Sequence, residues 1–133
     1  RLADVVKLND EEQQILAPLL EVAGSNPADF AAHLQQLGVQ TVVITRGEKG
    51  CAVFGENESA DVAGEPVEVV DTVGAGDAFT AAFIVGSLRG WPLETVARLA
   101  NRVGGLVASR PGAMPDVAAE ADERMACAES GRL

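Results

Sequence analysis

The sequence is poor in the side chains that most often build metal and disulfide sites. Its 133 residues include one histidine, His33, and two cysteines, Cys51 and Cys127. The cysteines lie far apart and have no metal-ligand spacing. They fit reduced thiols better than a disulfide framework, so we expect a cytoplasmic protein.

Basic residues and long apolar runs are also scarce. Ten Lys and Arg against twenty Asp and Glu give a formal net charge of −10, which argues against nucleic acid or an anionic membrane as a partner. No apolar run approaches the ~20 residues of a membrane-spanning helix, and no signal peptide is visible. The 47% apolar content is ordinary for a globular protein, and the length suits one small domain.

The most informative segment is the run Asp71–Phe79, with the sequence DTVGAGDAF. Alternating valines before it favour a strand, and the apolar segment after it is typical of a buried helix. A Gly-x-Gly turn that opens a helix makes an anion pocket, because the backbone can come close and the first helical N–H groups lack internal partners. Asp77 at such a pocket would be a base beside a bound phosphate, which indicates phosphoryl transfer to a hydroxyl. An ordinary turn with a helix-capping aspartate is the alternative.

This run resembles the C-terminal signature of the ribokinase-like sugar kinases, also called the phosphofructokinase-B family. The resemblance extends along nearly the whole chain to about Pro115. It implies that Asp77 takes the proton from the sugar hydroxyl that attacks the γ-phosphate of ATP. It also implies that backbone N–H groups around Gly74, Ala75 and Gly76 form the anion hole. The implied fold is the C-terminal portion of a three-layer α/β/α structure with a mostly parallel sheet.

Two further motifs resemble family positions. Asn9 and Glu12 follow a predicted strand and lie on one side of a first helical turn, where their oxygens suit hydrated Mg²⁺ near a triphosphate. A plain acidic helix N-terminus is the alternative. Thr45 and Gly47 resemble the family's Thr-x-Gly turn, which lines the nucleotide phosphates and ribose, although a simple hairpin turn explains them equally well. Lys7 also follows the strand-like run, and nothing in the sequence assigns it a role.

Two more expectations come from the resemblance. Asn101 and Gly104 resemble positions beside the adenine ring, with a helix–helix contact that needs small residues as the alternative. Asp71 and the carbonyl of Val73, together with backbone oxygens around residues 110–112, resemble a monovalent-cation site, which would bind K⁺.

Strands alternate with helices along the chain, which predicts the α/β class with a mostly parallel sheet and some antiparallel hairpin. Predicted strands cover residues 5–8, 41–45, 51–54, 60–63 and 67–70, and predicted helices cover residues 11–22, 27–37, 76–89, 93–109 and 116–128. In the first helix, the leucines and isoleucine between positions 15 and 20 are expected to form the buried face.

The chain begins at Arg1 and a buried strand is predicted almost at once. With the resemblance, this leads us to expect a single-domain fragment, the nucleotide-binding and catalytic part of a longer sugar kinase, with residues 116–133 as an exposed helix and tail. The missing N-terminal part would carry the lid and most sugar contacts, and the intact protein could be a homodimer. We expect the isolated chain to be inactive, because the acceptor would not be held against Asp77.

The acceptor stays open among several alcohols. The run VKLNDEE is similar to fructokinase-like members, so a hexose such as fructose is the first expectation. Ribose, 2-keto-3-deoxygluconate, phosphosugars and nucleosides stay open. Alternatives are a kinase of the same fold for a vitamin-type alcohol and a non-catalytic nucleotide-binding or regulatory module. A dinucleotide-binding domain is disfavoured, because the Gly-x-Gly turn lacks the third glycine at the needed spacing.

Overall fold

The computed structural model describes residues 3–24, 26–112 and 114–133. Its strands are β1 (Val5–Asn9), β2 (Thr41–Thr45), β3 (Cys51–Phe54) and β4 (Ser59–Val62), and its helices are α1 (Asp10–Leu19), α2 (Pro27–Gln36), α3 (Ala75–Leu88), α4 (Leu93–Ala108) and α5 (Ala118–Glu129). A single 3-10 turn, Gly47–Lys49, joins β2 to β3. None of the helices in the described ranges has the length and apolarity needed to cross a membrane.

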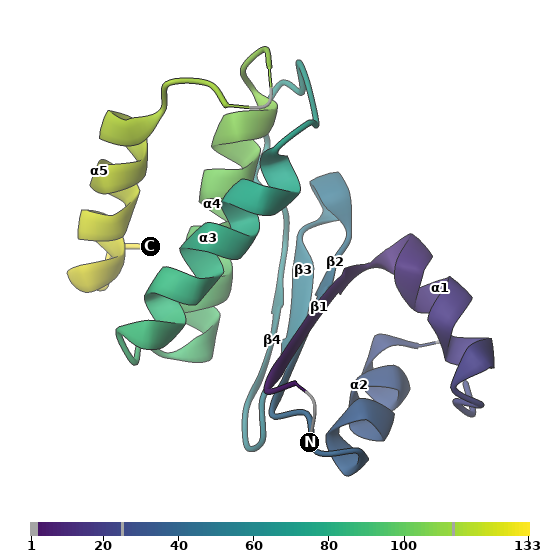
Figure 1. Ribbon diagram of the computed structural model, residues 1–133. Coiled ribbons are helices and arrows are strands. Elements are labelled where there is room, and N and C mark those ends of the chain that lie inside the picture. Colours follow the sequence, from purple (N-terminus) through teal and green to yellow (C-terminus); the bar gives the residue numbers. More distant parts are fainter. Residues whose placement is uncertain (1–2, 25, 113) are drawn as a thin grey trace.

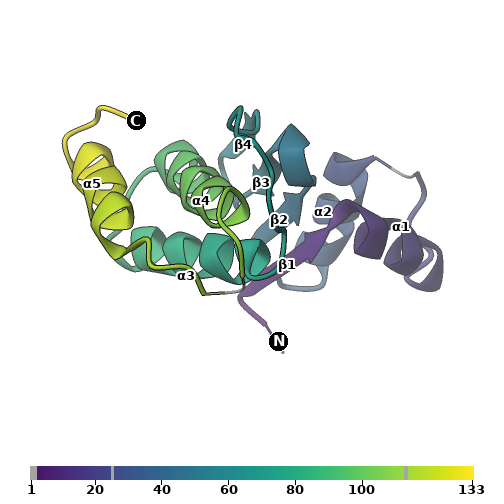
Figure 2. The same cartoon turned by 90° about the horizontal axis from the view of Figure 1, so that it is seen from above.

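The elements form three layers, so the predicted α/β/α class is confirmed (Figures 1 and 2). Helices α1 and α2 pack on one face of the sheet, α4 packs on the other face beside α3, and α5 packs on α4. Residues alternate across the strands accordingly. Val43, Cys51 and Val53 belong to the core that includes α3 and α4. Val42 and Ile44 belong to the core with α2, which explains the uninterrupted β-branched sequence of β2.

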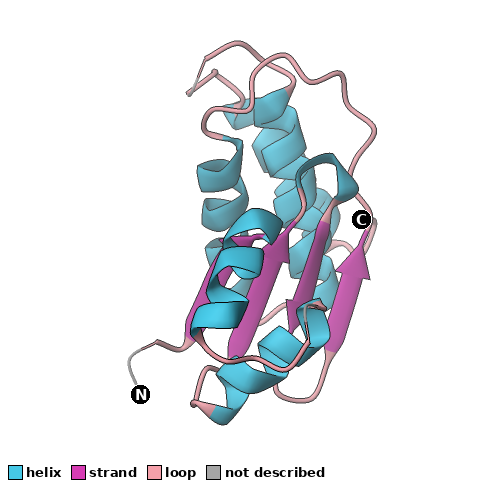
Figure 3. Cartoon of the chain, turned by 90° about the vertical axis from the view of Figure 1, so that its right-hand side faces the viewer, coloured by secondary structure: helices cyan, strands magenta, loops and turns pink. Residues whose placement is uncertain are grey.

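The four strands lie in the order β1-β2-β3-β4 (Figure 3). Only β1 and β2 are parallel, with Lys7 opposite Val43 and Asn9 opposite Thr45. The pairs β2–β3 and β3–β4 are antiparallel, so within this chain the expectation of a mostly parallel sheet is wrong. The reason is the connections, since short turns can join only antiparallel strands, whereas α1 and α2 lie between β1 and β2.

The predicted buried face of α1 is also wrong, except at Leu20, which packs against the core that contains Phe30. Ile15 and Leu19 are 65% and 73% exposed, and the helix instead buries Gln13 and Ala17. Ala17 packs in the core with Leu8, and its small side chain lets the helix lie close to the sheet. Hydrophobic spacing alone could not select this face, because α1 begins directly after β1 and its buried face depends on the neighbours that it meets.

The valine-rich segment 67–70 is extended but is no strand of the sheet. The backbone N–H groups of Val70 and Asp71 both donate to the carbonyl of Ala108, at 2.9 and 3.1 Å. Val67 lies over α4, where a Cβ on Gly105 would be 3.7 Å from its methyl groups. The alternating valines therefore do not pair in a β-ladder, and Val67 packs against α4 instead.

Candidate active site

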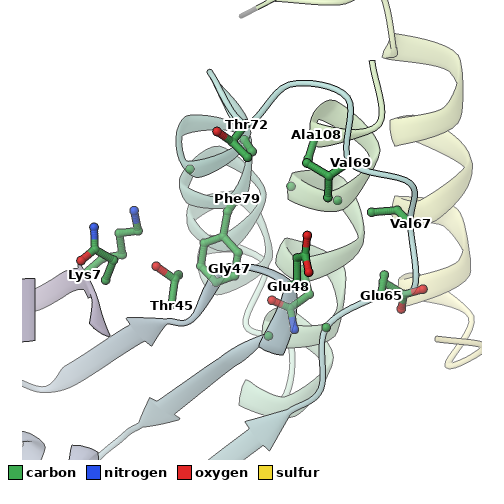
Figure 4. A pocket seen from close by; sticks show the side chains of 18 residues that line it. Lys7, Thr45, Gly47, Glu48, Glu65, Val67, Val69, Thr72, Phe79 and Ala108 are labelled. Carbon is green, nitrogen blue, oxygen red and sulfur yellow. The ribbon is translucent and has the colours of Figure 1, made fainter. Parts of the chain in front are cut away.

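A cavity of about 300 Å³ lies at the ends of β1 and β2, between the sheet and the helices α3 and α4 (Figure 4). Eighteen residues line it: Lys7, Asn9, Thr45, Gly47, Glu48, Gly50, Gly64, Glu65, Val67, Val69, Thr72, Ala75, Gly76, Phe79, Asn101, Gly104, Gly105 and Ala108. Ligands of α/β proteins commonly bind beyond the carboxyl ends of parallel strands. The cavity brings together seven of the twelve residues that the sequence singled out.

The N-terminus of α3 opens into this cavity. Gly74 takes the left-handed conformation, with φ of 83°, and no side chain caps the helix. The N–H of Ala75 donates to Thr72 at 3.2 Å, and the N–H of Ala78 donates to Gly74 at 2.9 Å. In the described chain this leaves the N–H groups of Gly76 and Asp77 without a partner, so they are available to an anion.

Asp77 lies in the first turn of α3 and is exposed. Ala75 and Gly76 line the cavity, whereas Gly74 and Asp77 do not. The carboxylate is thus beside the anion pocket and outside the cavity wall. A proton acceptor at this place would face a second molecule that approaches the phosphate from solvent.

Thr45 and Gly47 both line the cavity, as their place after β2 predicts. The hydroxyl of Thr45 donates to the carbonyl of Leu8 at 3.4 Å and so ties β2 to β1. Gly47 has a φ of 57°, and a Cβ there would meet nothing within 4 Å. This turn therefore offers open space rather than a packed hairpin tip.

Two lining glycines were missed by the sequence reasoning. A Cβ on Gly50 would lie 1.9 Å from the carbonyl oxygen of Val62, and one on Gly64 would lie 1.9 Å from that of Glu48. The turn after β2 and the segment after β4 therefore touch through their backbones. Gly50 also has a φ of 94°, and no local pattern marked the long-range contact at Gly64.

Asn9 and Glu12 form a capping box at the start of α1. The side chain of Asn9 accepts from the N–H of Glu12 at 2.7 Å, and the carboxylate of Glu12 accepts from the N–H of Asn9 at 2.8 Å. Asn9 lines the cavity and Glu12 does not. The pair therefore has a definite structural role, and its binding of Mg²⁺ stays a prediction. No cluster of three or more His, Cys, Asp or Glu that could hold a metal occurs in the described chain.

Asn101 and Gly104 lie on the cavity side of α4. The amide of Asn101 donates to the carbonyls of Val62 and Ala63, both at 3.3 Å, and so anchors the end of β4. A Cβ on Gly104 would lie 3.2 Å from the carbonyl oxygen of Ala75. The helix–helix contact weighed as an alternative is therefore present, and a place beside adenine stays a prediction.

Asp71 connects the loops before α3 and after α4. Its carboxylate accepts from the N–H of Val73 at 3.0 Å and from the N–H of Gly112 at 3.1 Å. The structure thus brings together the segments named for a K⁺ site. Neither Asp71 nor Val73 lines the cavity.

Two ion pairs involve residues in the cavity wall or next to it in the sequence. Arg46 binds Asp61 through two hydrogen bonds of 3.1 and 2.5 Å, which lowers the pKa of the Asp61 carboxyl below its usual range. Glu65 accepts from Arg102 at 2.9 Å.

Cys51 is fully buried in the core between the sheet and the helices α3 and α4. Burial raises the pKa of its thiol to about 11, so this cysteine is a packing residue and not a nucleophile.

Residues 1–120 match the pfkB family of carbohydrate kinases. The chain belongs to this family. The fructokinase of Escherichia coli is 34% identical over 121 residues, which are 86% of this chain and 38% of that protein. The cytidine kinase of Thermococcus kodakarensis is 41% identical over 83 residues, which are 61% of this chain and 30% of that protein.

Solved structures agree with this assignment of the pfkB chain. A candidate ribokinase II from Escherichia coli, solved in complex with ATP and Mg²⁺, has a TM-score of 0.79 and 30% identity. The match covers 92% of this chain and 39% of that one. The pfkB chain thus spans about two fifths of the length of these relatives, apart from the shorter match to the cytidine kinase.

Proposed function

We propose that this chain is the nucleotide-binding and catalytic part of an ATP-dependent carbohydrate kinase. The observation that carries the proposal is the uncapped N-terminus of α3, which opens into the cavity with Asp77 beside it. Membership of the carbohydrate kinase family supports the reaction class. The similar structure from Escherichia coli, which was solved with ATP and Mg²⁺, supports ATP as the nucleotide.

In the proposed complex, the terminal phosphate lies at the N–H groups of Gly76 and Asp77. The ribose and base extend past Gly47 towards the far wall, where Val67 and Val69 supply apolar surface (Figure 4). Asn101 and Gly104 lie on the α4 side of that wall. The negative phosphates suit a helix N-terminus, and the base suits the apolar wall.

The sugar binds on the exposed side of Asp77. Its hydroxyl gives its proton to the Asp77 carboxylate while the hydroxyl oxygen bonds to the γ-phosphorus of ATP. The bond between that phosphorus and the β,γ-bridging oxygen breaks, and ADP leaves with the bridging oxygen. Charge on the transferring group is stabilised by the two N–H groups, which are already oriented before the reaction.

Mg²⁺ would be held through water by the carboxylate of Glu12 and the side chain of Asn9. These oxygen donors fit a hard cation, because a carboxylate in one hydrogen bond keeps further lone pairs. Phosphate oxygens and water would supply the other ligands, and the ion would neutralise phosphate charge. We also propose a K⁺ ion at the carboxylate of Asp71 and the carbonyl of Val73, because these are oxygen donors as well. The loop at residues 110–112 lies beside them, since the N–H of Gly112 donates to Asp71.

For the acceptor we propose a hexose such as fructose, on the similarity to fructokinases. A nucleoside is the second candidate, because a cytidine kinase matches at 41% identity over a shorter stretch. The remainder of the intact protein would complete the acceptor site.

The test is ADP release by the full-length protein against a panel of sugars and nucleosides. We expect turnover with one acceptor class and a loss of 10²-fold or more in Asp77→Asn, as for a positioned base. Asp122→Asn, an exposed carboxylate on α5, is the matched control and should be unchanged. ATP binding without acceptor-dependent turnover would instead support a regulatory module.

A further inference from the structure

A second, smaller cavity of about 150 Å³ lies between the segment after β4 and the helices α4 and α5. Four residues line it: Glu65, Val67, Arg102 and Arg124. Glu65 and Val67 also line the first cavity, so one chain segment forms part of both walls, and Figure 4 shows these two residues on the side of the pale-yellow helix α5. Pockets for drug-sized ligands measure roughly 300–1,000 Å³, so the second cavity suits a small ligand and not a nucleotide.

Two guanidinium groups reach this cavity from different helices. Arg102 lies on α4, and its Nε donates to the carboxylate of Glu65 at 2.9 Å. Arg124 lies on α5, and its Nη1 donates to the backbone carbonyl of Glu120 at 3.1 Å. The other nitrogens of both groups have no acceptor in the described chain. Both side chains belong to partly buried residues, where charges are screened less than on an open surface.

The charge of Arg124 is not balanced by a carboxylate. None of the ion pairs among the described residues includes it. Glu120, one helical turn earlier, binds Arg110 instead at 3.0 Å. The chain has twenty acidic and ten basic residues, so a shortage of carboxylates does not explain the unpaired arginine. Two positive groups and one carboxylate line the cavity, which makes it locally positive within a chain of net charge −10.

We propose that Arg102 and Arg124 bind a small phosphate-type anion in this second cavity, at a site separate from the nucleotide cavity. In the proposed complex, Nη1 and Nη2 of Arg102 and Nε and Nη2 of Arg124 donate to the oxygens of the anion, in the paired geometry that guanidinium groups use for phosphate. Glu65 stays on Nε of Arg102 and holds that side chain in place. Free phosphate and the phosphate group of a small ester share this chemistry.

The bound anion connects α5 to α4. Of the residues of α5, all of which the structure describes, only Ala128 is buried, so the helix has little apolar anchoring of its own. An anion held by one arginine from each helix adds to this packing. Because a ligand that binds only the folded protein stabilises it by mass action, phosphate should raise the thermal stability.

The test measures binding of radiolabelled phosphate to the full-length protein by equilibrium dialysis at constant ionic strength. A saturating non-hydrolysable ATP analogue is present to occupy the first cavity. The variants are Arg102→Met, Arg124→Met and Arg124→Lys, each checked for folding by circular dichroism. Arg98→Met is the matched control, since Arg98 is an exposed arginine of α4 that pairs with Glu94.

We expect one saturable site with a Kd on the order of 1 mM, as a few charge-assisted contacts provide. Each Met variant should weaken the binding about 10-fold or more, because a bond to a charged group is lost. Arg124→Lys should weaken it less, since it keeps the charge and loses the paired donors. Arg98→Met should bind as wild type, and phosphate should raise its Tm and that of the wild type more than the Tm of Arg124→Met.

Competition identifies the source of the phosphate group. Stronger displacement by unlabelled phosphate than by glycerol 3-phosphate would assign the site to the free ion, and the reverse order would assign it to an ester. Acetate that displaces as well as either would contradict a site for phosphate-type anions. Arg124→Met breaks only one bond to its own helix, so it carries the test if Arg102→Met fails to fold.

The outcomes are independent of the proposed kinase reaction. A wild-type protein without saturable phosphate binding, or binding that both Met variants retain, would overturn the anion site and leave the kinase standing. Phosphate binding that depends on Arg102 and Arg124, in a protein that shows no acceptor-dependent turnover, would support the anion site and count against the kinase.

Discussion

At the scale of single residues, Gly64 shows how a contact between distant segments fixes residue type. Its φ lies outside the left-handed region, so only the 1.9 Å approach of a Cβ to the carbonyl oxygen of Glu48 forbids a side chain. We expect Gly64→Ala to lower the free energy of unfolding by about 3 kcal/mol or more, at the upper end of overpacking effects. Urea denaturation measures this change.

Gly38→Ala is the control for that prediction. Gly38 has a φ of 98°, and a Cβ there would meet nothing within 4 Å. Its substitution should cost about 1–2 kcal/mol through backbone strain alone. If Gly64→Ala costs no more than Gly38→Ala, the two backbones are not in the contact that the structure gives them.

The positions of residues at the cavity were predictable from the sequence where the motif is local. Ala75 and Gly76 lie at the cavity as the Gly-x-Gly turn indicated, and Thr45 and Asn9 lie there because parallel strands end at one edge. Gly64 was not predictable in this way. Its partner Glu48 lies in another turn, and no spacing rule connects the two.

At the scale of elements, the start of α1 combines a capping box with a proposed metal role, and Glu12 can separate them. Glutamine also fits the capping box, so Glu12→Gln should keep the stability, whereas Glu12→Ala should lose about 1 kcal/mol. If the carboxylate holds hydrated Mg²⁺, both variants should need more Mg²⁺ for half-maximal activity. Thermal unfolding and Mg²⁺ titration of the full-length protein provide the two measurements.

Glu11→Gln is the matched control, since Glu11 is an exposed carboxylate of the same helical turn. It changes the charge at the helix N-terminus by the same amount and should leave the Mg²⁺ requirement unmoved. A wild-type Mg²⁺ requirement in the Glu12→Gln protein would contradict a role of Glu12 in binding Mg²⁺ and would leave only its capping role.

Most elements were predicted within about two residues because caps and glycines mark their ends. The strands 41–45 and 51–54 match, and α2 begins at Pro27 as the Asn-Pro pair indicated. The failures have one cause. The exposed face of α1 and the unpaired segment 67–70 both depend on which neighbour an element meets, and hydrophobic periodicity does not contain that information.

At the scale of the whole molecule, the three layers followed from alternating strands and helices, but the strand directions did not. The sheet order places β1 at an edge, with β2 as its only partner in the described chain. Val5 on this strand is 50% exposed, and Ile84 and Leu88 on α3 are 52% and 83% exposed. These exposed apolar side chains lie on the edge strand and on the same helix that carries Asp77 in its first turn.

We expect the 133-residue chain alone to show no sugar-dependent ADP release, although it retains the nucleotide cavity. The described chain offers walls for the nucleotide, but Asp77 faces outward with no wall to hold a sugar hydroxyl against it. Effective orientation supplies a large part of the barrier reduction in such a reaction, so its loss removes turnover. A coupled ADP assay of the chain beside the full-length protein, with circular dichroism to show that the chain is folded, makes the measurement. Sugar-stimulated ADP release by the folded chain would mean that the acceptor site is complete within these residues.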